Sequence, residues 1–501
     1  MNLYQQISAY RNRDDIYIKN AGESPVAYRD FFENVDRLAE TLDSILPAKG
    51  VVFSDLPKSV ESVTLLMACI KLGLGFCFID TTLPTARKLS VFNRVNPILC
   101  VCTPEFGADL TANNESSSCA DLLAKSPVTF QHAYLSVNKI NTQYDGNIIF
   151  TSGSTGEPKG VMVGLLALAH YVDSMLEVMN ERAGTWLSLC PIHFDVFQLD
   201  FLVQFARGFN IVIADSGLLP QQIMTLLKSD DITEFLAIST ILKMMGLIYQ
   251  GKPQELPKLT RVYYGGEGCP VSVLKTIAGI FPQAKFCQFY GPTENTNNTT
   301  FFKFDQPFDT DTGFMPLGNS LKHVDIQLIN EHGSKIQEPR IEGQIIIAGQ
   351  QLMDGYLGTE QTEQLKIFED GSKAYYTGDF GYRDEQGRLW FTGRKDDLVK
   401  IRGNRVSLQE VEAAVLKSMP AGAYAIALVR QKNGFDSLVA GVSSDKKIEI
   451  KSIKSDISKT LPVYAVPESI IEIDFSEIKT LSTGKLDRKN FKACLLKQLE
   501  G

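Results

Sequence analysis

A loop rich in hydroxyl side chains and glycines has the composition of an anion-binding segment. It follows the apolar residues 148–150, which we expect to end a strand, and it closes with Lys159 and Gly160. Glycine lets the backbone run close to a bulky anion, successive N–H groups and hydroxyls can bond phosphate oxygens, and a lysine adds positive charge. A flexible surface loop is the alternative, and neither the P-loop pattern nor Gly-x-Gly-x-x-Gly occurs here. The candidate phosphate ligands are Thr151, Ser152, Gly153, Ser154, Thr155, Gly156 and Lys159.

A turn after a second predicted strand carries three further candidates. The strand covers residues 285–289, and the Gly-Pro pair that follows Tyr290 predicts a tight turn. A carboxylate beside phosphates is a natural Mg²⁺ ligand, which suits Glu294, and the hydroxyl of Thr293 could donate to a phosphate oxygen. The ring of Tyr290 could stack on a purine. Taken alone, this pentapeptide favours an ordinary turn.

An aspartate and a later arginine could bind a sugar. Asp379 ends the sequence Tyr-Thr-Gly-Asp, and Arg394 lies in Gly-Arg-Lys-Asp. One carboxylate can accept hydrogen bonds from two vicinal ribose hydroxyls, and an arginine can donate to the same hydroxyls. Because Thr-Gly-Asp is common at turns, the two sites carry weight only together.

In their order and spacing, these motifs resemble those of the adenylate-forming enzymes. That family includes acyl-CoA synthetases, luciferases and the adenylation domains of peptide synthetases. The resemblance spans roughly residues 26 to 489, nearly the whole chain. The motifs that carry it are Thr151–Gly160, Tyr290–Glu294, Tyr376–Asp379, Lys400–Val406 and Ser482–Arg488.

The resemblance implies a role for each motif. Asp379 would hold the ribose of ATP with help from Arg394, the backbone of Gly266 and Glu267 would pack on adenine, and Tyr290 would lie beside it. Thr293 would donate a hydrogen bond to the α-phosphate, and Glu294 would be a ligand of Mg²⁺. Asp396 would be a hinge, Gly403 would line the path of a pantetheine thiol, and Lys485 would reach the carboxylate and α-phosphate oxygens during adenylation.

The pair Phe194-Asp195 bears on the acid that is activated. In amino-acid-activating relatives an aspartate at this place binds the α-ammonium, whereas a helix N-cap is the alternative use. By position, the side-chain pocket would contain Val196, Leu199, Leu236, Tyr263, Gly265, Phe289, Asn297 and Asn298, in addition to Asp195.

We expect a small or medium uncharged amino acid, because a charged side chain would be buried unpaired. Tyr263 and Phe289 would narrow the pocket, and Gly265 would open one wall. Asn297 and Asn298 would bond either a polar side chain or each other. Proline, D- or L-alanine and a small polar amino acid all stay open.

The predicted function is therefore the conversion of an amino acid and Mg·ATP to aminoacyl-AMP, followed by transfer to the phosphopantetheine thiol of a carrier protein. We expect that carrier to be a separate protein, because no carrier segment follows the Lys485 motif. An acyl-CoA synthetase acting on a small carboxylic acid is the alternative. A protein that binds nucleotide without turnover is a third, which intact Lys485, Glu294 and Asp379 disfavour.

These residues require strand ends to position them, and the sequence predicts an α/β fold. Strands and helices alternate from residue 26 to 265, which is typical of parallel α/β architecture. Residues 104–125 and 131–146 read as loops and short helices. Beyond Pro316 we expect a β-rich subdomain. The predicted division is a large N-terminal domain, residues 1–395, hinged to a small α+β C-terminal domain, residues 396–501.

The composition of the whole chain limits the partners and the compartment that we expect for this protein. The chain has 501 residues and a net charge of −8, with no basic run, which disfavours nucleic-acid binding. The nine cysteines show no Cys-x-x-Cys spacing and fit a reducing compartment. No signal peptide or membrane-spanning run is apparent, so we expect a cytoplasmic protein without a membrane partner.

Overall fold

The structure is a computed structural model that divides into two compact units. The larger unit holds Met1–Thr81, Phe92–Ile149 and Gly160–Lys395, and the smaller holds Thr82–Val91, Phe150–Lys159 and Asp396–Gly501. The residues described are 2–46, 49–112, 116–118, 133–136, 142–151, 158–181, 183–310, 313–359, 363–394, 398–420, 423–432, 434–444, 446–479 and 486–500.

The first sheet of the larger unit is mostly parallel, as the alternation of strands and helices predicts. Its strands run in the order β16 (Asn319–Ser320), β15 (Thr300–Phe304), β14 (Lys285–Tyr290), β13 (Arg261–Gly265), β12 (Glu234–Ile238), β10 (Thr185–Ser188), β11 (Asn210–Ile213), β1 (Tyr17–Asn20) and β2 (Val26–Ala27). Every pair from β14 to β1 is parallel, and the outermost pairs are antiparallel. The carboxyl ends of these strands therefore share one edge, where ligands of open α/β sheets bind.

The second sheet contains the strand that leads into the glycine-rich loop. Its order is β19 (Gly355–Tyr356), β9 (Lys159–Gly164), β8 (Gly146–Thr151), β4 (Gly75–Phe78), β3 (Val51–Ser54), β5 (Leu99–Val101), β7 (Ala133–Ser136) and β6 (Ser116–Ser118). The strands β6 and β7 and the helix α5 (Pro104–Ala112) fall where we expected loops and short helices. These two strands could not be predicted from the local sequence, because β7 pairs with β5, a buried strand that is distant along the chain.

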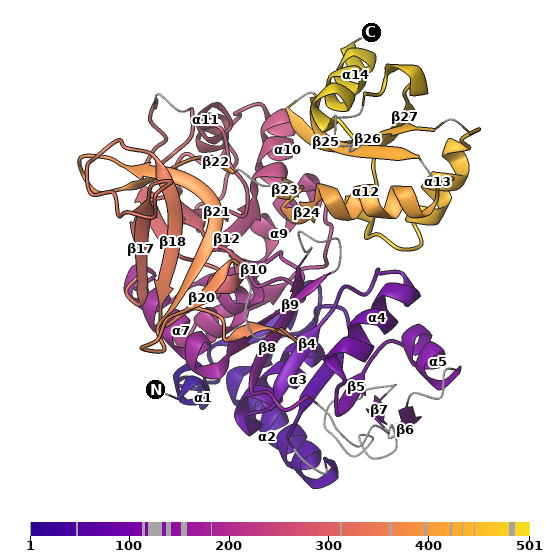
Figure 1. Ribbon diagram of the computed structural model, residues 1–501. Coiled ribbons are helices and arrows are strands. Elements are labelled where there is room, and N and C mark those ends of the chain that lie inside the picture. The colour runs from indigo at the N-terminus through magenta and orange to yellow at the C-terminus, as the bar shows by residue number, and fades with distance from the viewer. Residues whose placement is uncertain are drawn as a thin grey trace. The chain divides into compact units, whose positions relative to one another are not determined.

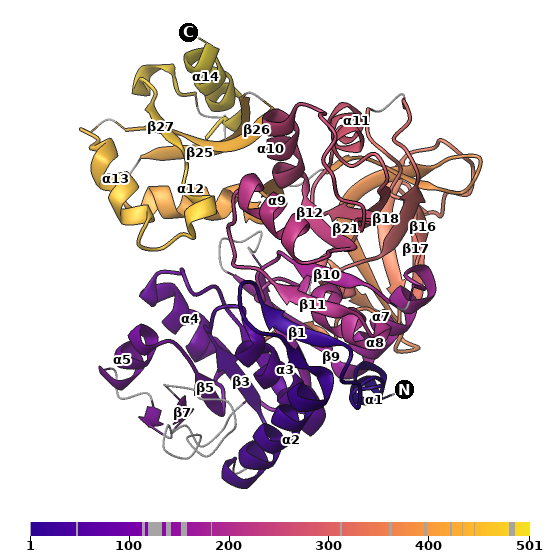
Figure 2. The same cartoon turned by 180° about the vertical axis from the view of Figure 1, so that it is seen from behind.

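Helix α3 (Val60–Leu72) is buried on all sides. Every residue from Ser62 to Ile70 is buried, whereas a surface helix buries only one face. The helix packs against α1 (Leu3–Ile7), α2 (Tyr28–Ile45), β1 and β4, so it lies between the two sheets (Figures 1 and 2). Ser59 and Ser62 form a capping box at its N-terminus, which supplies partners for otherwise orphaned N–H groups.

The β-rich subdomain predicted beyond Pro316 is an antiparallel sheet. It runs β17 (Val324–Ile329), β18 (Gly343–Gly349), β21 (Lys373–Arg383) and β20 (Leu365–Ile367), with β22 (Leu389–Arg394) paired to β21 (Figure 1). Asp379 and Arg394 are register partners across β21 and β22. The sheet thus brings the two sugar-binding candidates face to face.

The C-terminal part of the smaller unit is α+β. A hairpin of β23 (Leu398–Ile401) and β24 (Asn404–Ser407) precedes α12 (Leu408–Lys417), and a sheet of β25 (Tyr424–Lys432), β26 (Phe435–Ser443) and β27 (Ser469–Glu472) follows. The helices α13 (Ile450–Ile457) and α14 (Arg488–Glu500) complete it. Ser407 accepts a hydrogen bond from the Glu410 N–H and so caps α12.

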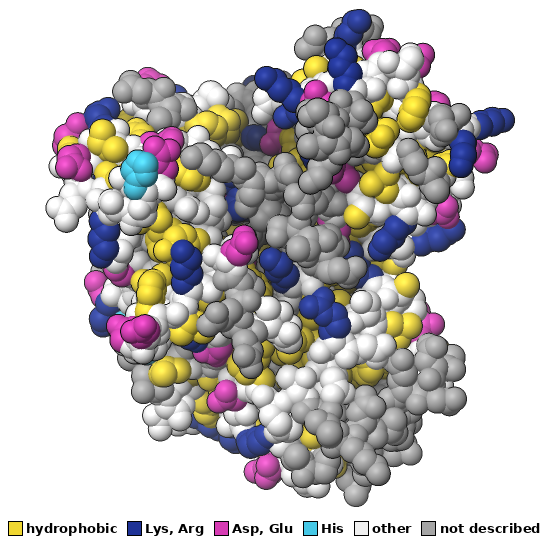
Figure 3. Space-filling model, in the orientation of Figure 1, with side chains coloured by type: hydrophobic (Ala, Val, Ile, Leu, Met, Phe, Trp, Pro, Cys, Tyr) yellow, Lys and Arg dark blue, Asp and Glu magenta, His cyan; other side chains and the backbone are white. Residues whose placement is uncertain are grey.

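The surface carries charges of both signs. Acidic and basic side chains are interspersed over the described part of the face in Figure 3. Among the residues the structure describes, no helix is long and apolar enough to cross a membrane.

A buried lysine lies behind the carboxyl end of β10. Lys58 Nζ donates to Ser188 O at 2.8 Å and to Ser188 Oγ at 3.1 Å. Ser188 Oγ in turn donates to Asp200 Oδ2 at 2.6 Å, and Trp186 Nε1 donates to Asp200 Oδ1 at 3.0 Å. Burial lowers the pKa of Lys58 to about 8, against the attraction of Asp200.

Lys58 should give the protein a pH-dependent stability. Its native pKa lies below its unfolded pKa, so between pH ~8 and ~10.4 the unfolded state binds a proton that the native state does not, and the free energy of unfolding rises with pH. We expect Lys58→Met to remove this rise, as measured by urea unfolding at pH 8 and pH 10. Lys258→Met, at an ion pair that is 62% and 75% exposed, is the control and should keep the wild-type slope. An unchanged slope in Lys58→Met would contradict the assignment.

Candidate functional site

The candidate residues converge because their strands end at one edge. Asp195 follows β10, Gly266 and Glu267 follow β13, and Thr293 and Glu294 follow β14. Chain segments far apart in the sequence therefore contribute to the same region of the larger unit.

Asp195 bonds across the site instead of capping a helix. Thr293 Oγ1 donates to Asp195 Oδ2 at 2.6 Å, and both side chains are half-buried. The next helical segment is a π-helix, Gln198–Val203, whose N-cap residue is Phe197 and which has no side-chain cap. The N-cap alternative for Asp195 therefore does not hold for this helix, and short π-helices are frequent at functional sites.

A run of buried polar residues follows Thr293. Seven consecutive residues from Glu294 to Thr300 are each no more than 8% exposed. Gly291 is required at the preceding turn, because a Cβ there would lie 1.8 Å from the carbonyl oxygen of Asn297. Thr296 and Asn297 have φ angles of 52° and 71°, which are costly for residues other than glycine and cluster at functional sites.

Other elements supply hydrogen-bond partners to this buried run. Tyr356 Oη donates to Glu294 Oε1 at 3.0 Å, and Thr296 Oγ1 donates to Gln351 O at 2.5 Å. Gln351 Nε2 donates back to Asn298 O at 3.1 Å. The segment 351–356 thus holds the run in place from outside.

Tyr171 of α7 (Leu165–Val178) anchors the two asparagines. Asn298 Nδ2 donates to Tyr171 Oη at 3.0 Å, and Asn297 Nδ2 donates to it at 3.4 Å. The sequence left open whether these side chains bond each other, and the structure instead gives them a shared partner. Tyr171 is fully buried, which raises its hydroxyl pKa well above the ordinary value. Sequence reasoning missed it because one tyrosine in an apolar helix reads as a core residue.

The sugar-binding candidates form a small network. Arg394 Nη1 donates to Asp379 Oδ1 at 2.7 Å, and Tyr290 Oη donates to Asp379 Oδ2 at 2.5 Å. Arg394 also donates from Nη2 to Thr377 O at 3.0 Å. Burial, with the nearby Asp379 charge, raises the Tyr290 pKa well above its ordinary value, so Tyr290 stays a donor. Two donors thus fix the orientation of the Asp379 carboxylate.

The aromatic candidates of the side-chain pocket lie together. The rings of Tyr263 and Phe289 stack at 5.5 Å between centroids and 4° between planes. Tyr263 Oη donates to Glu234 Oε2 at 3.0 Å, and Glu234 pairs with the buried Arg207. Val196 is half-buried, and Leu199 and Leu236 belong to the same buried cluster as Tyr263 and Phe289. No sequence motif contains Glu234 or Arg207, so neither residue could be predicted to lie beside the pocket.

The expected role of Gly265 needs correction. We expected its missing side chain to open one wall of the pocket. A Cβ there would lie 2.9 Å from the carbonyl oxygen of Phe289 and 3.4 Å from its Cβ. The space is taken by the neighbouring strand, so this glycine accommodates close packing of β13 and β14 instead.

Gly266 and Glu267 also serve the fold locally. Gly266 has a φ angle of 82°, which glycine tolerates at no steric cost. Glu267 Oε1 accepts from the Thr240 N–H at 2.8 Å and from Thr240 Oγ1 at 2.7 Å, at the start of α10 (Ser239–Tyr249). A carboxylate is favourable at a helix N-terminus, so the Glu267 side chain has a structural task while its backbone is the part expected near adenine.

The smaller unit contains the remaining candidates. Thr151 ends β8 and Lys159 begins β9. Gly403, with a φ angle of 81°, forms the turn of the β23–β24 hairpin with Arg402. The candidates Ser152, Gly153, Ser154, Thr155, Gly156, Asp396 and Lys485 lie outside the described residues.

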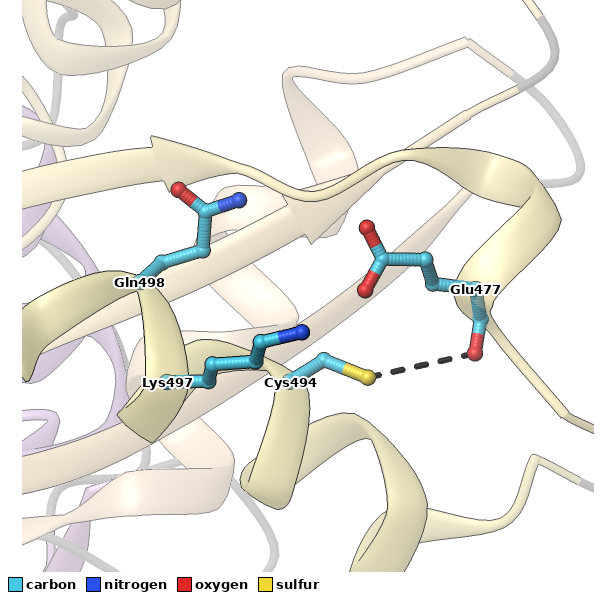
Figure 4. Close-up of a pocket in the computed structure, with 4 residues that line it drawn as sticks. All are labelled: Glu477, Cys494, Lys497 and Gln498. Carbon is cyan, nitrogen blue, oxygen red and sulfur yellow. Dashed lines mark hydrogen bonds between the residues drawn. The ribbon is translucent and has the colours of Figure 1, made fainter. Parts of the chain in front are cut away.

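A pocket of about 260 Å³ lies in the smaller unit, and no candidate is among the described residues that line it. It is lined by Glu477 and by Cys494, Lys497 and Gln498 of α14 (Figure 4). Cys494 Sγ lies 3.9 Å from the Glu477 carbonyl oxygen. Its residues play no part in the site described above.

Tyr171 generates a prediction that needs no ligand. Tyr171→Phe removes the acceptor of two buried amide groups, and a buried donor without a partner costs ~1–3 kcal/mol. We expect a loss of that size in the free energy of urea unfolding. Tyr382→Phe is the matched control, because the Tyr382 ring stacks on Trp390 while its hydroxyl has no hydrogen bond within the described residues. Equal stability of the two variants would show that Tyr171 does not hold the asparagines.

Comparisons with known proteins give the family. The family model described as AMP-binding enzyme matches residues 5–357. A D-alanine--D-alanyl carrier protein ligase of Bacillus licheniformis is 27% identical over 98% of this chain and 99% of its own. A protein of the same name from Staphylococcus aureus is 25% identical over 97% of both chains.

Solved structures share the fold. The adenylation domain AlmE of Vibrio cholerae, in complex with glycyl-adenosine-5'-phosphate, superposes with a TM-score of 0.80 at 19% identity, covering 100% of this chain and 97% of that one. PA1221, a nonribosomal peptide synthetase protein containing adenylation and carrier domains, gives a TM-score of 0.78 at 22% identity, covering 99% of this chain and 83% of that one. With a family model that matches most of its length, this chain belongs to the AMP-binding enzyme family.

Proposed function

We propose that this enzyme activates an amino acid as aminoacyl-AMP and passes the acyl group to the phosphopantetheine thiol of a separate carrier protein. The observation that carries the proposal is Asp195, a half-buried carboxylate hydrogen-bonded to Thr293 at the carboxyl edge of the sheet. A carboxylate in that place suits the α-ammonium of an amino acid, because a partly desolvated anion is stabilised by a cationic partner.

The nucleotide would be ATP, as the family suggests. Asp379, oriented by Arg394 and Tyr290, accepts hydrogen bonds from the ribose hydroxyls. The loop that begins at Thr151 and ends at Lys159 binds the phosphates. Adenine packs on the backbone of Gly266 and Glu267.

Mg²⁺ fits Glu294. This carboxylate is 1% exposed, and one of its oxygens accepts from Tyr356, which orients the group. Mg²⁺ prefers few protein carboxylates together with substrate phosphates, so a single glutamate suffices. When bound, the ion would offset negative charge on the phosphates that the substrate carboxylate approaches.

The chain's own residues then divide the reaction into two steps. In the first, Asp195 holds the ammonium while Thr293 and Lys485 donate to oxygens of the reacting carboxylate and α-phosphate, and pyrophosphate leaves. In the second, residues 396–501 move as a domain about Asp396, and Gly403 lines the path by which the carrier thiol attacks the acyl-adenylate. The thiol loses its proton, a thioester forms and AMP leaves. Donors placed where charge develops lower the barrier more than the same donors in water.

The substrate is a small uncharged amino acid, with D-alanine the first candidate. The stacked Tyr263 and Phe289 narrow the pocket, and the Cβ space of Gly265 is already filled by the neighbouring strand. Two relatives similar over nearly the full chain carry D-alanine and its carrier protein in their names. A cytoplasmic location agrees with ATP and a carrier protein as reactants.

The test is ATP–pyrophosphate exchange across the D- and L-amino acids, repeated with Asp195→Ala. Removing one partner of a desolvated pair costs ~3–5 kcal/mol, which at ~1.36 kcal/mol per tenfold is a loss of roughly a hundredfold to several thousandfold in kcat/KM. We expect that loss for the preferred amino acid, little change in the KM for ATP, and improved relative activity with the des-amino acid. Near-normal amino-acid activity in Asp195→Ala would favour a plain carboxylic acid and an acyl-CoA synthetase.

Lys485 should separate the two half-reactions. We expect Lys485→Ala to abolish pyrophosphate exchange while it still transfers the acyl group from preformed aminoacyl-AMP, because the lysine neutralises charge only as the carboxylate approaches the phosphate. Single-turnover assays of each step on the purified variant measure this, with Lys489→Ala as the control. Lost transfer alongside normal exchange would place Lys485 in the second step.

A further inference from the structure

The hydroxyl of Thr293 has one proton to donate, and in the structure its acceptor is the carboxylate of Asp195. Thr293 Oγ1 donates to Asp195 Oδ2 at 2.6 Å, a short distance typical of a hydroxyl bonded to an anion. In the proposed function the same hydroxyl donates to the α-phosphate. A single hydroxyl proton cannot serve both acceptors at once, so the two bonds exclude each other.

The backbone around Thr293 is held firmly, so the exchange between acceptors is local. The next residues are buried, the Asn295 N–H donates to Pro292 O at 3.0 Å, and the Met353 N–H donates to Glu294 O at 2.9 Å. The close approach of Gly291 to Asn297 fixes the preceding turn. Thr293 can therefore change partner by rotating its side chain or hydroxyl while its backbone stays in place.

We propose that the Thr293–Asp195 hydrogen bond couples the amino-acid site to the phosphate site. Without an amino acid, the Asp195 anion holds the Thr293 proton. An α-ammonium at Asp195 neutralises that anion, weakens its hold, and frees the hydroxyl to donate to the α-phosphate. The amino acid thereby tightens the binding of the nucleotide through its phosphate. This inference rests on the proposed function and adds a mechanism by which the two substrates bind cooperatively.

Thermodynamic linkage requires a reciprocal effect of the nucleotide on the binding of the amino acid. If the amino acid tightens AMP by some factor, AMP must tighten the amino acid by the same factor. Coupling free energies between sites typically correspond to ~5–150-fold. Adenosine, which lacks the phosphate, should produce no such effect.

The experiment is calorimetric titration of D-alanine, or of the amino acid that the exchange panel selects in its place, into the full chain alone, with saturating AMP, and with saturating adenosine. AMP and an amino acid do not react, so the titration reports binding alone. For the wild type we expect AMP to lower the Kd of the amino acid at least ~fivefold and adenosine to leave it within ~twofold. Thr293→Ser keeps a hydroxyl and should keep the effect.

Thr293→Val is the decisive variant, because valine has the shape of threonine without the hydroxyl. We expect the AMP effect to fall to that of adenosine, while adenosine binding itself confirms that the variant is folded. An AMP effect of wild-type size in Thr293→Val would overturn the proposal. Failure of the proposed function has a different signature, since an amino-acid Kd unchanged in Asp195→Ala without nucleotide would mean that Asp195 does not bind the amine.

Discussion

The burial of seven consecutive polar residues, 294–300, is the constraint on which the site depends. Each buried polar group needs a hydrogen-bond partner, and leaving one without costs ~1–3 kcal/mol. Tyr171, Gln351 and Tyr356 supply partners from α7 and from the segment after β18. The turn at Gly291 and the left-handed Thr296 and Asn297 are then maintained by the surrounding structure. A segment fixed this way holds the backbone of Thr293 beside Asp195 with little freedom.

The carboxyl end of strand β14 and the turn after it are both tied to functional candidates. Tyr290, at the strand end, bonds Asp379 of the antiparallel sheet, while Thr293, after the turn, bonds Asp195 of the parallel sheet's β10 loop. The sugar-binding and amine-binding candidates are therefore held a few residues apart on one rigid stretch. Rigid placement of this kind is what lets remote binding interactions orient reacting groups.

The sequence was sufficient for features that depend on local pattern. The alternation of strands and helices predicted from residue 26 to 265 is present, for example in β13, α2, α3 and α10, and the apolar periodicity is strong in α2. The anchors Tyr171, Gln351 and Glu234 could not be predicted, since each bonds a partner distant in the sequence and carries no motif. The role of Gly265 was also predicted wrongly. The sequence does not show whether the space beside a glycine is open or, as here, filled by a residue of the neighbouring strand.

The carboxylates of the site each have a donor before any ligand arrives. Asp379 has Tyr290 and Arg394, Glu294 has Tyr356, and Asp195 has Thr293. In the proposed function, ligand binding would therefore exchange hydrogen bonds more than add them, and a neutral exchange contributes little. The charge of the bound group is then the difference between an amine and its des-amino analogue. An ammonium would compensate the Asp195 anion, whereas a methyl group in its place would desolvate that anion without pairing it. In the proposed function, selectivity for an amine over its des-amino analogue would thus follow from the cost of desolvating the half-buried Asp195 carboxylate without adding a cation.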